Sequence, residues 1–406
     1  MEAQARERLH FLLLNIGHFL DHLFTLIFAT VAALALTREW GLGYADLVKY
    51  ATPGFFAFGV FALPAGWLAD RWSREGMMSV FFVGIGLAAI ATAFARTPVE
   101  VAVGLFVVGV FAAIYHPVGL AIVVQRWKGT GMRLAVNGVW GNLGVASAAL
   151  ITGYFIDHGG WRAAFVVPGI VSILVGIAYT ALVWPVIVRP PQRTAGLKAA
   201  GATATSADLK ALLLRVSLIV FLTTAVSSIV FQSTTFALPK VLDERLGGLA
   251  LSATLIGQLA FLVFAIGSIG QLIVGHFLDR LGPRSVFMTA AAIQVAFFAA
   301  MPGLVDWAAL LCATIFMLAA FGQIPINDYM IGRLAEGEYR ARIYGVRYVV
   351  SFTVLAAALP LIAFIYENWG FDALFRVLAV SAAVILVAVA MLPRRLPSPQ
   401  GAAANA

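Results

Sequence analysis

The chain has 406 residues, of which 62% are hydrophobic and only 11% are charged. Soluble globular domains carry about 25% charged residues, so a chain this apolar cannot form a water-compatible surface and must be solvated by lipid. The formal net charge of +8 does not indicate a nucleic-acid-binding protein, because the basic residues lie in short joints between apolar runs and form no continuous stripe. The single cysteine, Cys312, excludes an intrachain disulfide.

Long apolar runs predict the membrane-spanning helices. A helix needs about 20 apolar residues to cross the hydrocarbon core of a bilayer. In chain order, the runs of this length lie at 10–37, 47–69, 76–96, 99–125, 132–156, 163–185, 212–238, 252–278, 284–302, 307–331, 342–366 and 372–393. The sequence therefore predicts an all-α membrane protein with twelve transmembrane helices and both termini on one side.

The basic residues predict the orientation and the longest joint predicts the domain boundary. Most lysines and arginines lie at the N-terminus and in the even-numbered joints, which the positive-inside rule assigns to the cytoplasm. We therefore expect a multi-pass protein of the bacterial inner membrane with both termini cytoplasmic. The joint at 186–211 is rich in Pro, Ala, Gly and Thr and is predicted to be a linker between bundles at 1–185 and 212–393, with a tail at 394–406.

Two joints repeat the pattern G-x-L-x-D-R-x-x-x-R, with Phe277 in place of leucine in the second copy. The matching positions are Gly66, Asp70, Arg71 and Arg74 after the second span, and Gly275, Asp279, Arg280 and Arg284 after the eighth. The glycines allow a neighbouring helix to approach closely, and the carboxylates can meet an arginine or a helix N-terminus. The repetition predicts two six-helix bundles related by pseudo-two-fold symmetry about the membrane normal.

This paired motif resembles the signature of the major facilitator superfamily, and the resemblance covers the whole chain. It implies the major facilitator fold, a transporter rather than an enzyme, and alternating access to a site between the bundles. It also implies that the two joints form a gate; the alternative is that their charges only fix topology. The expected gate partners are Arg342 or Arg347 for Asp70, and Arg133 or Arg340 for Asp279.

Polar residues inside the first and fourth spans form the main candidate site. An ionisable side chain at membrane depth costs roughly 2.5–3.5 kcal/mol, so it marks a functional site by default. The first-span residues that share one face at three- and four-residue steps are Asn15, His18, His22 and Thr25, flanked by Asp21. A rise of about 1.5 Å per residue places His116 of the antiparallel fourth span at a similar depth. Because histidine changes charge near physiological pH, we predict that Asp21 with His18, His22 and His116 couples transport to protons.

The stretches at 17–22, 115–117 and 138–144 resemble fosmidomycin-resistance-type efflux transporters, although Gly17 replaces a serine and Asp21 follows the histidine by three residues instead of four. This resemblance implies export of a small organic or amphiphilic solute in exchange for protons, by a monomer in contact with lipids. In the resembled family, helices 1, 4, 7 and 10 line the cavity. The expected substrate-binding residues are Asn15, Thr25, Tyr115, Asn142, Gln232, Gln323, Asn327 and Asp328.

Alternatives to this hypothesis stay open. A single buried histidine can simply bond a backbone carbonyl, and Pro117 is expected to kink the fourth span whatever its function. His18 and His22, at i and i+4, could ligate a divalent metal with Asp21 or His116, so a metal-ion or nutrient carrier is one alternative. A transporter-like receptor or scaffold is another. No phosphate-binding loop occurs, so transport is expected to be driven by a gradient without a cofactor.

Overall fold

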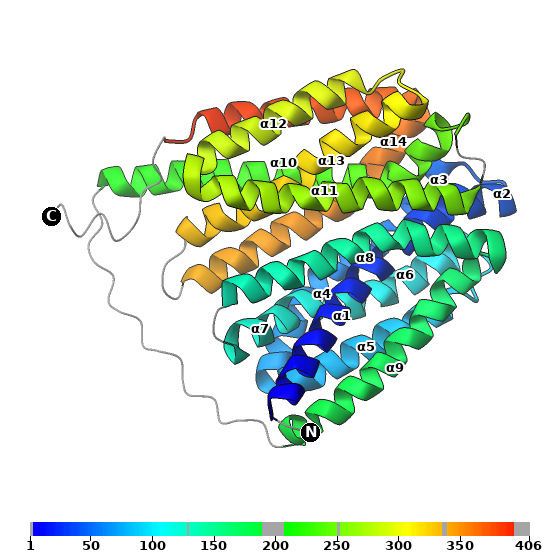
Figure 1. The fold of residues 1–406 in the computed structure, drawn as a ribbon, viewed down its shortest axis with the longest axis vertical. Coiled ribbons are helices and arrows are strands. Elements are labelled where there is room, and N and C mark those ends of the chain that lie inside the picture. Colours follow the sequence, from blue (N-terminus) through cyan, green and yellow to red (C-terminus); the bar gives the residue numbers. More distant parts are fainter. Residues whose placement is uncertain (1–2, 128–129, 189–206, 250–251, 335–338, 394–406) are drawn as a thin grey trace.

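The computed structural model describes residues 3–127, 130–188, 207–249, 252–334 and 339–393, and over these residues it contains helices and no strands. Lipid offers no hydrogen-bond partners, so each spanning segment satisfies its backbone within itself as a helix. The helices form two bundles that meet at one end and diverge toward the other, where the N-terminus lies (Figure 1). The predicted all-α membrane fold is confirmed.

The first bundle runs from the N-terminal helix to the start of the predicted linker. Its elements are α1 (Ala3–Val31), η1 (Ala32–Leu36), α2 (Thr37–Glu39), α3 (Tyr44–Lys49), α4 (Thr52–Arg71), α5 (Arg74–Thr92), α6 (Pro98–Ala112), η2 (Tyr115–Gly119), α7 (Leu120–Arg126), α8 (Thr130–His158) and α9 (Trp161–Val188). Side-chain caps fix where two of these helices begin. The Ser73 hydroxyl accepts from the backbone N–H of Gly76 and caps α5, and the Thr97 hydroxyl accepts from that of Glu100 and caps α6.

The second bundle has fewer but longer elements. They are α10 (Ala207–Arg245), α11 (Ala253–Leu281), α12 (Pro283–Ala300), α13 (Asp306–Leu334) and α14 (Tyr339–Ala390). The 52 residues of α14 would extend about 78 Å, more than twice the thickness of a bilayer core. Gly370, with φ 72° and ψ −173°, breaks it into two helices.

These helices confirm the predicted number of spans. Eleven described helices are long and apolar enough to cross a membrane, and one of them, Val349–Ala390, contains two predicted spans separated by Gly370. The ends differ from expectation: α10 continues past the predicted end at 238 to Arg245, and Pro239 does not terminate it. The linker prediction at 186–211 falls mostly outside the described residues and stays a prediction.

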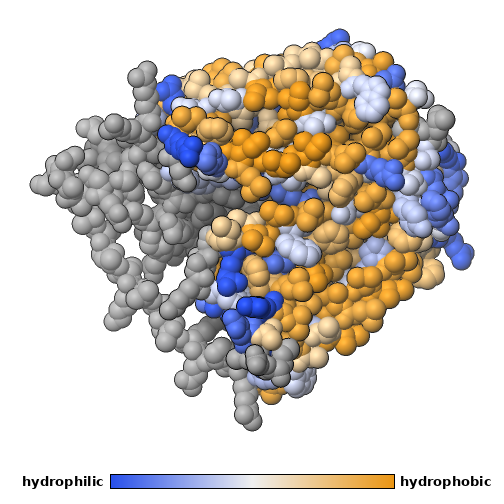
Figure 2. All heavy atoms as spheres, in the orientation of Figure 1, coloured by the Kyte–Doolittle hydropathy of each residue, from blue (hydrophilic) through white to orange (hydrophobic). Residues whose placement is uncertain are grey.

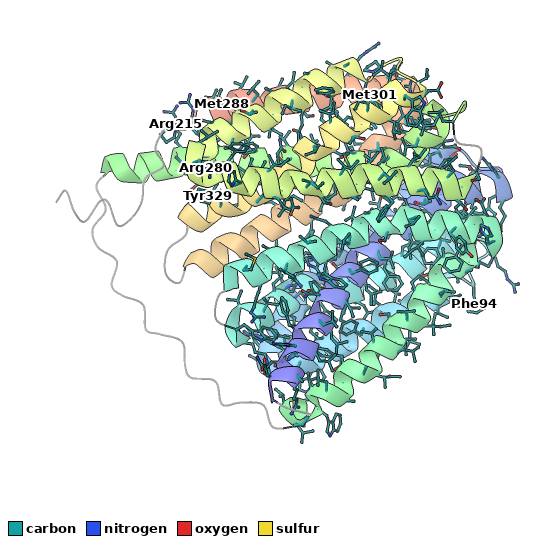
Figure 3. The ribbon with its side chains drawn as sticks, viewed as in Figure 1. Phe94, Arg215, Arg280, Met288, Met301 and Tyr329 are labelled. Atoms are coloured by element: carbon teal, nitrogen blue, oxygen red, sulfur yellow. The ribbon has the colours of Figure 1, made fainter. Side chains whose placement is uncertain are left out.

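The surface is that of a protein surrounded by lipid. Apolar side chains cover the sides of both bundles, and hydrophilic ones gather at the two ends (Figure 2). Phe94 points away from its bundle and is 73% exposed, whereas Arg215 and Arg280 lie toward the end that carries the termini (Figure 3). We call the end with the N-terminus, Arg71 and Arg126 the terminal face, and the end with Glu39 and Asp157 the opposite face.

Contacts between the bundles hold the opposite face closed. Lys49 Nζ lies 3.4 Å from Glu367 Oε2, and Asp157 Oδ2 accepts from both the backbone N–H (2.7 Å) and the hydroxyl (2.6 Å) of Thr254. α8 and α11 lie side by side along this boundary (Figure 1). Toward mid-depth the contact continues with Gln271 Nε2, which donates to Asn142 Oδ1 at 3.3 Å.

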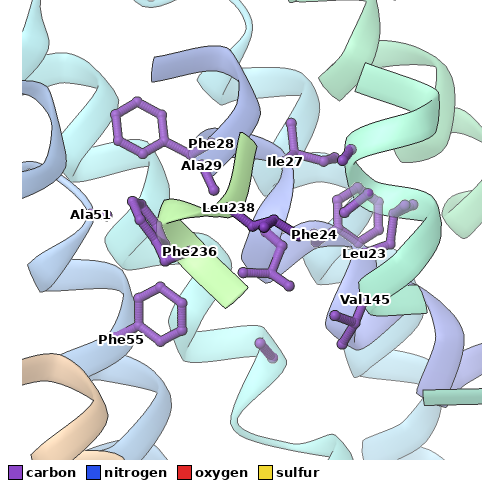
Figure 4. Packing of buried hydrophobic residues seen from close by; sticks show 14 of the residues in the cluster. Leu23, Phe24, Ile27, Phe28, Ala29, Ala51, Phe55, Val145, Phe236 and Leu238 are labelled. Carbon is purple, nitrogen blue, oxygen red and sulfur yellow. The ribbon is translucent and has the colours of Figure 1, made fainter. Parts of the chain in front are cut away.

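Aromatic side chains fill the interior beside this closed end. Phe55 of α4 lies 6.2 Å, centroid to centroid, from Phe236 of α10, so the second bundle covers an apolar pocket of the first (Figure 4). The lining of that pocket includes Phe24, Thr25, Phe28, Phe55 and Phe58. Cys312 is buried and its thiol donates to the carbonyl of Phe297.

Candidate functional site

The structure brings the predicted histidines of the first and fourth spans together. The ring centroids of His18, His22 and His116 lie 5.0–5.4 Å apart. His18 is nearly buried, whereas His22 and His116 are partly exposed. His18 can lie this close to α8 because position 141 is glycine: a Cβ there would lie 2.7 Å from His18 Nε2. Three imidazoles from two elements therefore form one compact cluster.

A π-helical turn places the fourth-span residues. The predicted disturbance at Pro117 takes the form of η2, which interrupts the helix between α6 and α7. Tyr115, at the start of this turn, stacks on the His18 ring at 4.7 Å and donates its hydroxyl hydrogen to the carbonyl of Leu14 at 2.9 Å. His116 follows at once, so a single turn supplies both the packing contact and the third imidazole.

Asp21 lies behind the imidazoles. Its side chain has no exposed surface, and its Oδ2 lies 3.4 Å from His116 Nε2. Neither carboxylate oxygen has a hydrogen-bond partner among the described residues. A buried carboxylate without hydrogen bonds is costly when charged, so its charge state depends on His116 and on access of water.

Asn137 of α8 connects the elements around the cluster, and the sequence reasoning missed it. Its side-chain N–H₂ donates to Asn15 Oδ1 and to the Tyr115 hydroxyl, each at 2.8 Å. Its backbone carbonyl accepts from His18 Nδ1 at 2.8 Å, which leaves Nε2 as the free nitrogen of His18. The available signal was an amide inside an apolar span, one turn before Gly141.

The spacing of the three imidazoles would also allow them to bind a metal cation. One ring nitrogen from each of His18, His22 and His116 lies within 4.8 Å of the others, and the fixed Nδ1–H of His18 resembles the outer-shell bond of many metal-binding histidines. The arrangement thus offers a compact cluster of titratable rings beside one buried carboxylate.

The remaining predicted substrate residues fall into three groups. In the first bundle, Asn15 and Tyr115 belong to the Asn137 network, and Thr25 donates to the carbonyl of His22. Asn142 lies at the bundle boundary, bonded to Gln271. These residues are close to the cluster or to the boundary, but their polar groups are largely occupied within the protein.

The second-bundle candidates lie on α10 and α13. Gln323 donates to Gln294 at 2.6 Å in the interior of the bundle. Gln232 and Asn327 are buried, and Gln232 Nε2 and Asn327 Oδ1 have no hydrogen-bond partner among the described residues. The side chain of Asp328 lies outside the described residues. Among the described side chains, these candidates of the second bundle are neutral amides, in contrast to the titratable groups of the first.

The predicted gate residues are only partly described. Asp70 Oδ1 lies 2.9 Å from Arg74 Nη2 of its own joint, and Arg71 packs over the Trp67 ring. In the second joint, Arg284 donates to the carbonyl of Ala390, and Arg280 is exposed. The side chains of Asp279, Arg340, Arg342 and Arg347 lie outside the described residues, so the predicted pairs, including those with Arg133, stay predictions.

The two signature glycines, Gly66 and Gly275, are expected to let a neighbouring helix approach closely, and a close neighbour is described for Gly66 only. A Cβ at Gly66 would contact Pro117 at 3.4 Å, so a side chain of η2 passes beside it. A Cβ at Gly275 would meet nothing within 4 Å among the described residues. The close approach expected at Gly275 has no partner among the described residues and stays a prediction.

Two paired helical bundles with a cluster of titratable side chains inside the spans are the features of a membrane transport protein. The chain belongs to the Major Facilitator Superfamily, whose sequence model matches residues 14–248 and 220–406. This membership and the transporter relatives below identify a transporter and not an enzyme.

Curated relatives include transporters of small aromatic compounds. The chain is 25% identical over 64% of its length to a gallate transporter of Pseudomonas putida and 30% identical over 41% to the niacin transporter NiaP of Acinetobacter baylyi. It is 27% identical over 41% to the 4-hydroxybenzoate transporter PcaK of Pseudomonas putida. The matches span 63%, 39% and 37% of these relatives. These relatives do not confirm the predicted fosmidomycin-resistance-type subfamily.

Solved structures share the fold over nearly the whole chain. A bacterial homologue of the human lysosomal transporter Spinster, in an inward-facing and occupied conformation, superposes with a TM-score of 0.73 at 15% identity over 96% of each chain. A peptide transporter in complex with sulfate gives 0.73 at 14% identity over 95% of each. At this identity the likeness concerns the fold alone.

Proposed function

We propose that the chain is a proton-coupled secondary transporter that carries a small organic solute across the bacterial inner membrane by alternating access. The observation that supports this most directly is Asp21: a carboxylate fully buried in the first span, 3.4 Å from an imidazole and without hydrogen bonds among the described residues. A group that is costly to charge when dry and easily ionised when wet can carry a proton between two access states.

The relatives favour a class of solute. Gallate, niacin and 4-hydroxybenzoate, named for three of them, are each a single aromatic ring with an acid group. We therefore propose a small aromatic acid as the first solute class to test. Export in exchange for protons, expected from the fosmidomycin-resistance resemblance, stays a prediction; a relative named puromycin resistance protein, from Streptomyces alboniger, is consistent with efflux.

We also propose that the terminal face is cytoplasmic and that the closed opposite face makes this an inward-facing state. The distribution of lysine and arginine supports the first point, because positive charge is retained on the cytoplasmic side. The bonds of Asp157 to Thr254 and of Lys49 to Glu367 support the second.

Reconstituted transport tests proton coupling. The purified chain in liposomes with a trapped pH-sensitive dye is given a pH gradient and gallate, 4-hydroxybenzoate or nicotinate on one side. We expect solute-dependent proton flux that falls at least tenfold in Asp21→Asn. Asp306→Asn, at the first residue of α13 with a φ of 50° that asparagine also adopts, is the matched control and should retain the flux.

The same assay gives the direction. Protons and solute that move in opposite directions indicate exchange, and movement together indicates symport. Solute flux that ignores the pH gradient, or full coupling in Asp21→Asn, would contradict the proposal. Flux of a divalent cation in place of an organic solute, lost when the histidines are replaced, would favour the metal-carrier alternative.

A further inference from the structure

We infer that a surface groove between α10 and the second half of α14 binds one anionic phospholipid, with its phosphate at Arg376 and an acyl chain along the groove. The inference concerns the outer surface of the second bundle and does not depend on the transported solute or on proton coupling. It goes beyond general solvation by the bilayer, because it assigns one site to one class of lipid.

The groove is apolar along most of its length. It has a volume of about 360 Å³. Its apolar wall consists of Val226 and Ile229 of α10 and of Val377, Val380 and Val384 of α14. The three α14 positions follow steps of three and four residues and therefore share one face of the helix. Because valine side chains are short, they leave the space between the two helices open to a flexible apolar chain.

The groove belongs to a surface that faces lipid. On α10, Leu214, Leu218 and Leu222 are 62%, 63% and 47% exposed, and Val226 continues this row at the next four-residue step. On α14, Val380 is 65% exposed. Apolar side chains are favoured in lipid over water, so a continuous exposed row of them within two spans indicates contact with acyl chains.

Arg376 places a positive charge at one end of this apolar surface. Its side chain is exposed, lines the groove, and has no hydrogen bond or ion pair with any residue that the structure describes. Asp372, one turn earlier, is bonded instead to Arg245 and to the backbone N–H of Gly303. A guanidinium within a span is costly without a counter-ion. A phosphate supplies one, and two of its oxygens can accept parallel hydrogen bonds from the guanidinium.

The depth of the groove matches one leaflet of a bilayer. The second half of α14 begins at Gly370, beside Trp369, which is 61% exposed as expected for an aromatic residue at the membrane interface. At a rise of about 1.5 Å per residue, Arg376 lies about 9 Å beyond Gly370 and Val384 about 21 Å beyond it. Half of a bilayer with its headgroups is about 20–22 Å thick. The groove therefore has its charge at headgroup level and its apolar end near the bilayer centre, which is the polarity of a phospholipid.

The nearby charges favour an anionic lipid over a zwitterionic one. The amine of a zwitterionic headgroup needs an acidic partner close to the phosphate site. Two acidic residues near this end of α14 already have basic partners, because Asp372 pairs with Arg245 and Glu367 pairs with Lys49. The charge of Arg376 is thus available to a headgroup with a net negative charge.

Native mass spectrometry of the purified full chain tests the charge contact. The protein is stripped of lipid in detergent and titrated with phosphatidylglycerol or with phosphatidylcholine of the same acyl chains. We expect one phosphatidylglycerol to bind in preference to phosphatidylcholine. Arg376→Gln should weaken this binding about fivefold, the effect of one basic residue on an anionic lipid. Arg96→Gln is the matched control, because Arg96 is an exposed arginine between α5 and α6 in the first bundle, and it should leave binding unchanged.

A second pair of variants tests the acyl-chain contact. Val380→Trp fills the groove from an exposed position, so it should displace the acyl chain and weaken phosphatidylglycerol binding while the protein stays folded. Val387→Trp, at a position of the same helix that is 63% exposed and does not line the groove, should bind as the wild type does. Phosphatidylglycerol with a photoreactive acyl chain should crosslink to α10 and α14 in the wild type and not in Val380→Trp.

Three results would overturn the inference. The first is equal binding of the two lipids, or wild-type binding of phosphatidylglycerol in both Arg376→Gln and Val380→Trp. The second is equal weakening by the two control variants, because the lipid would then have no single site. The third is a dimer that is lost in Val380→Trp, because a second copy of the chain would then cover the groove. None of these results bears on solute-dependent proton flux in liposomes, so this inference and the proposed function fail separately.

Discussion

At the scale of residues, Asn137 links three elements of the first bundle. Its amide bonds Asn15 of α1 and Tyr115 of η2, and Tyr115 stacks on His18, so the orientation of an imidazole depends on an amide that is not next to it in sequence. The proximity of His18, Asp21, His22 and His116 could be predicted from helical periodicity and depth. The role of Asn137 could not, because it depends on partners from two other helices.

Replacement of this amide has a measurable cost. Asn137→Ala leaves the Asn15 side-chain oxygen Oδ1 and the Tyr115 hydroxyl without their donor, and we expect a loss of stability of about 1 kcal/mol, seen as a lower Tm in detergent. Asn368→Ala, which removes only an exposed bond to the carbonyl of Phe364, is the control and should change the Tm little.

A second substitution tests the network itself. Because the hydroxyl of Tyr115 accepts from Asn137, Tyr115→Phe combined with Asn137→Ala should cost less than the sum of the single variants. Strict additivity, or an unchanged Tm in Asn137→Ala, would show that these bonds contribute nothing to the fold.

At the scale of elements, α8 and α11 approach each other most closely where one of them carries a glycine. A Cβ at Gly153 would lie 2.2 Å from the carbonyl oxygen of Ala253, so glycine is required for this approach. The sequence predicted both helices from their apolar runs. It did not indicate which glycines face the other bundle, since small residues occur along much of α8.

This contact can be tested with two substitutions on one helix. Gly153→Ala should force α8 and α11 apart and raise the population with an open opposite face, as measured by spin-label distances across that face. Gly138→Ala, also on α8, adds a Cβ that meets no atom of the described residues within 4 Å and should leave the distances unchanged. Equal distances in both variants would show that the helices accommodate the methyl group without opening.

At the scale of the whole molecule, polar contacts between the bundles determine which end is closed. Arg38 and Asp243 lie 3.9 Å apart, and Lys49 pairs with Glu367, but such exposed pairs contribute roughly 0–1 kcal/mol each. Asp157 is different, because it accepts two short hydrogen bonds at the N-terminus of α11, where the helix dipole favours a negative charge. We expect this contact to stabilise the closed opposite face most.

The corresponding variant should shift the balance of states. Asp157→Ala removes a helix cap worth about 1 kcal/mol, which corresponds to roughly a fivefold change toward the state with an open opposite face. Spin-label distances across the opposite face measure this change in population. Ser252→Ala removes a cap of the same helix within one bundle, so it should lower stability without this shift. A shift of equal size in Ser252→Ala would assign the effect to α11 and not to the contact between bundles.

The sequence by itself determined the membrane environment, the number of spans and the clustering of the first- and fourth-span histidines, because hydrophobic length and helical periodicity are local properties. Tertiary structure alone decided that Asn137 holds the cluster, that Phe58 and Phe352 meet beside His116, and that Asp157 closes the opposite face. These contacts join residues far apart in the chain, and their geometry depends on how the two bundles are inclined toward each other, which no local pattern encodes.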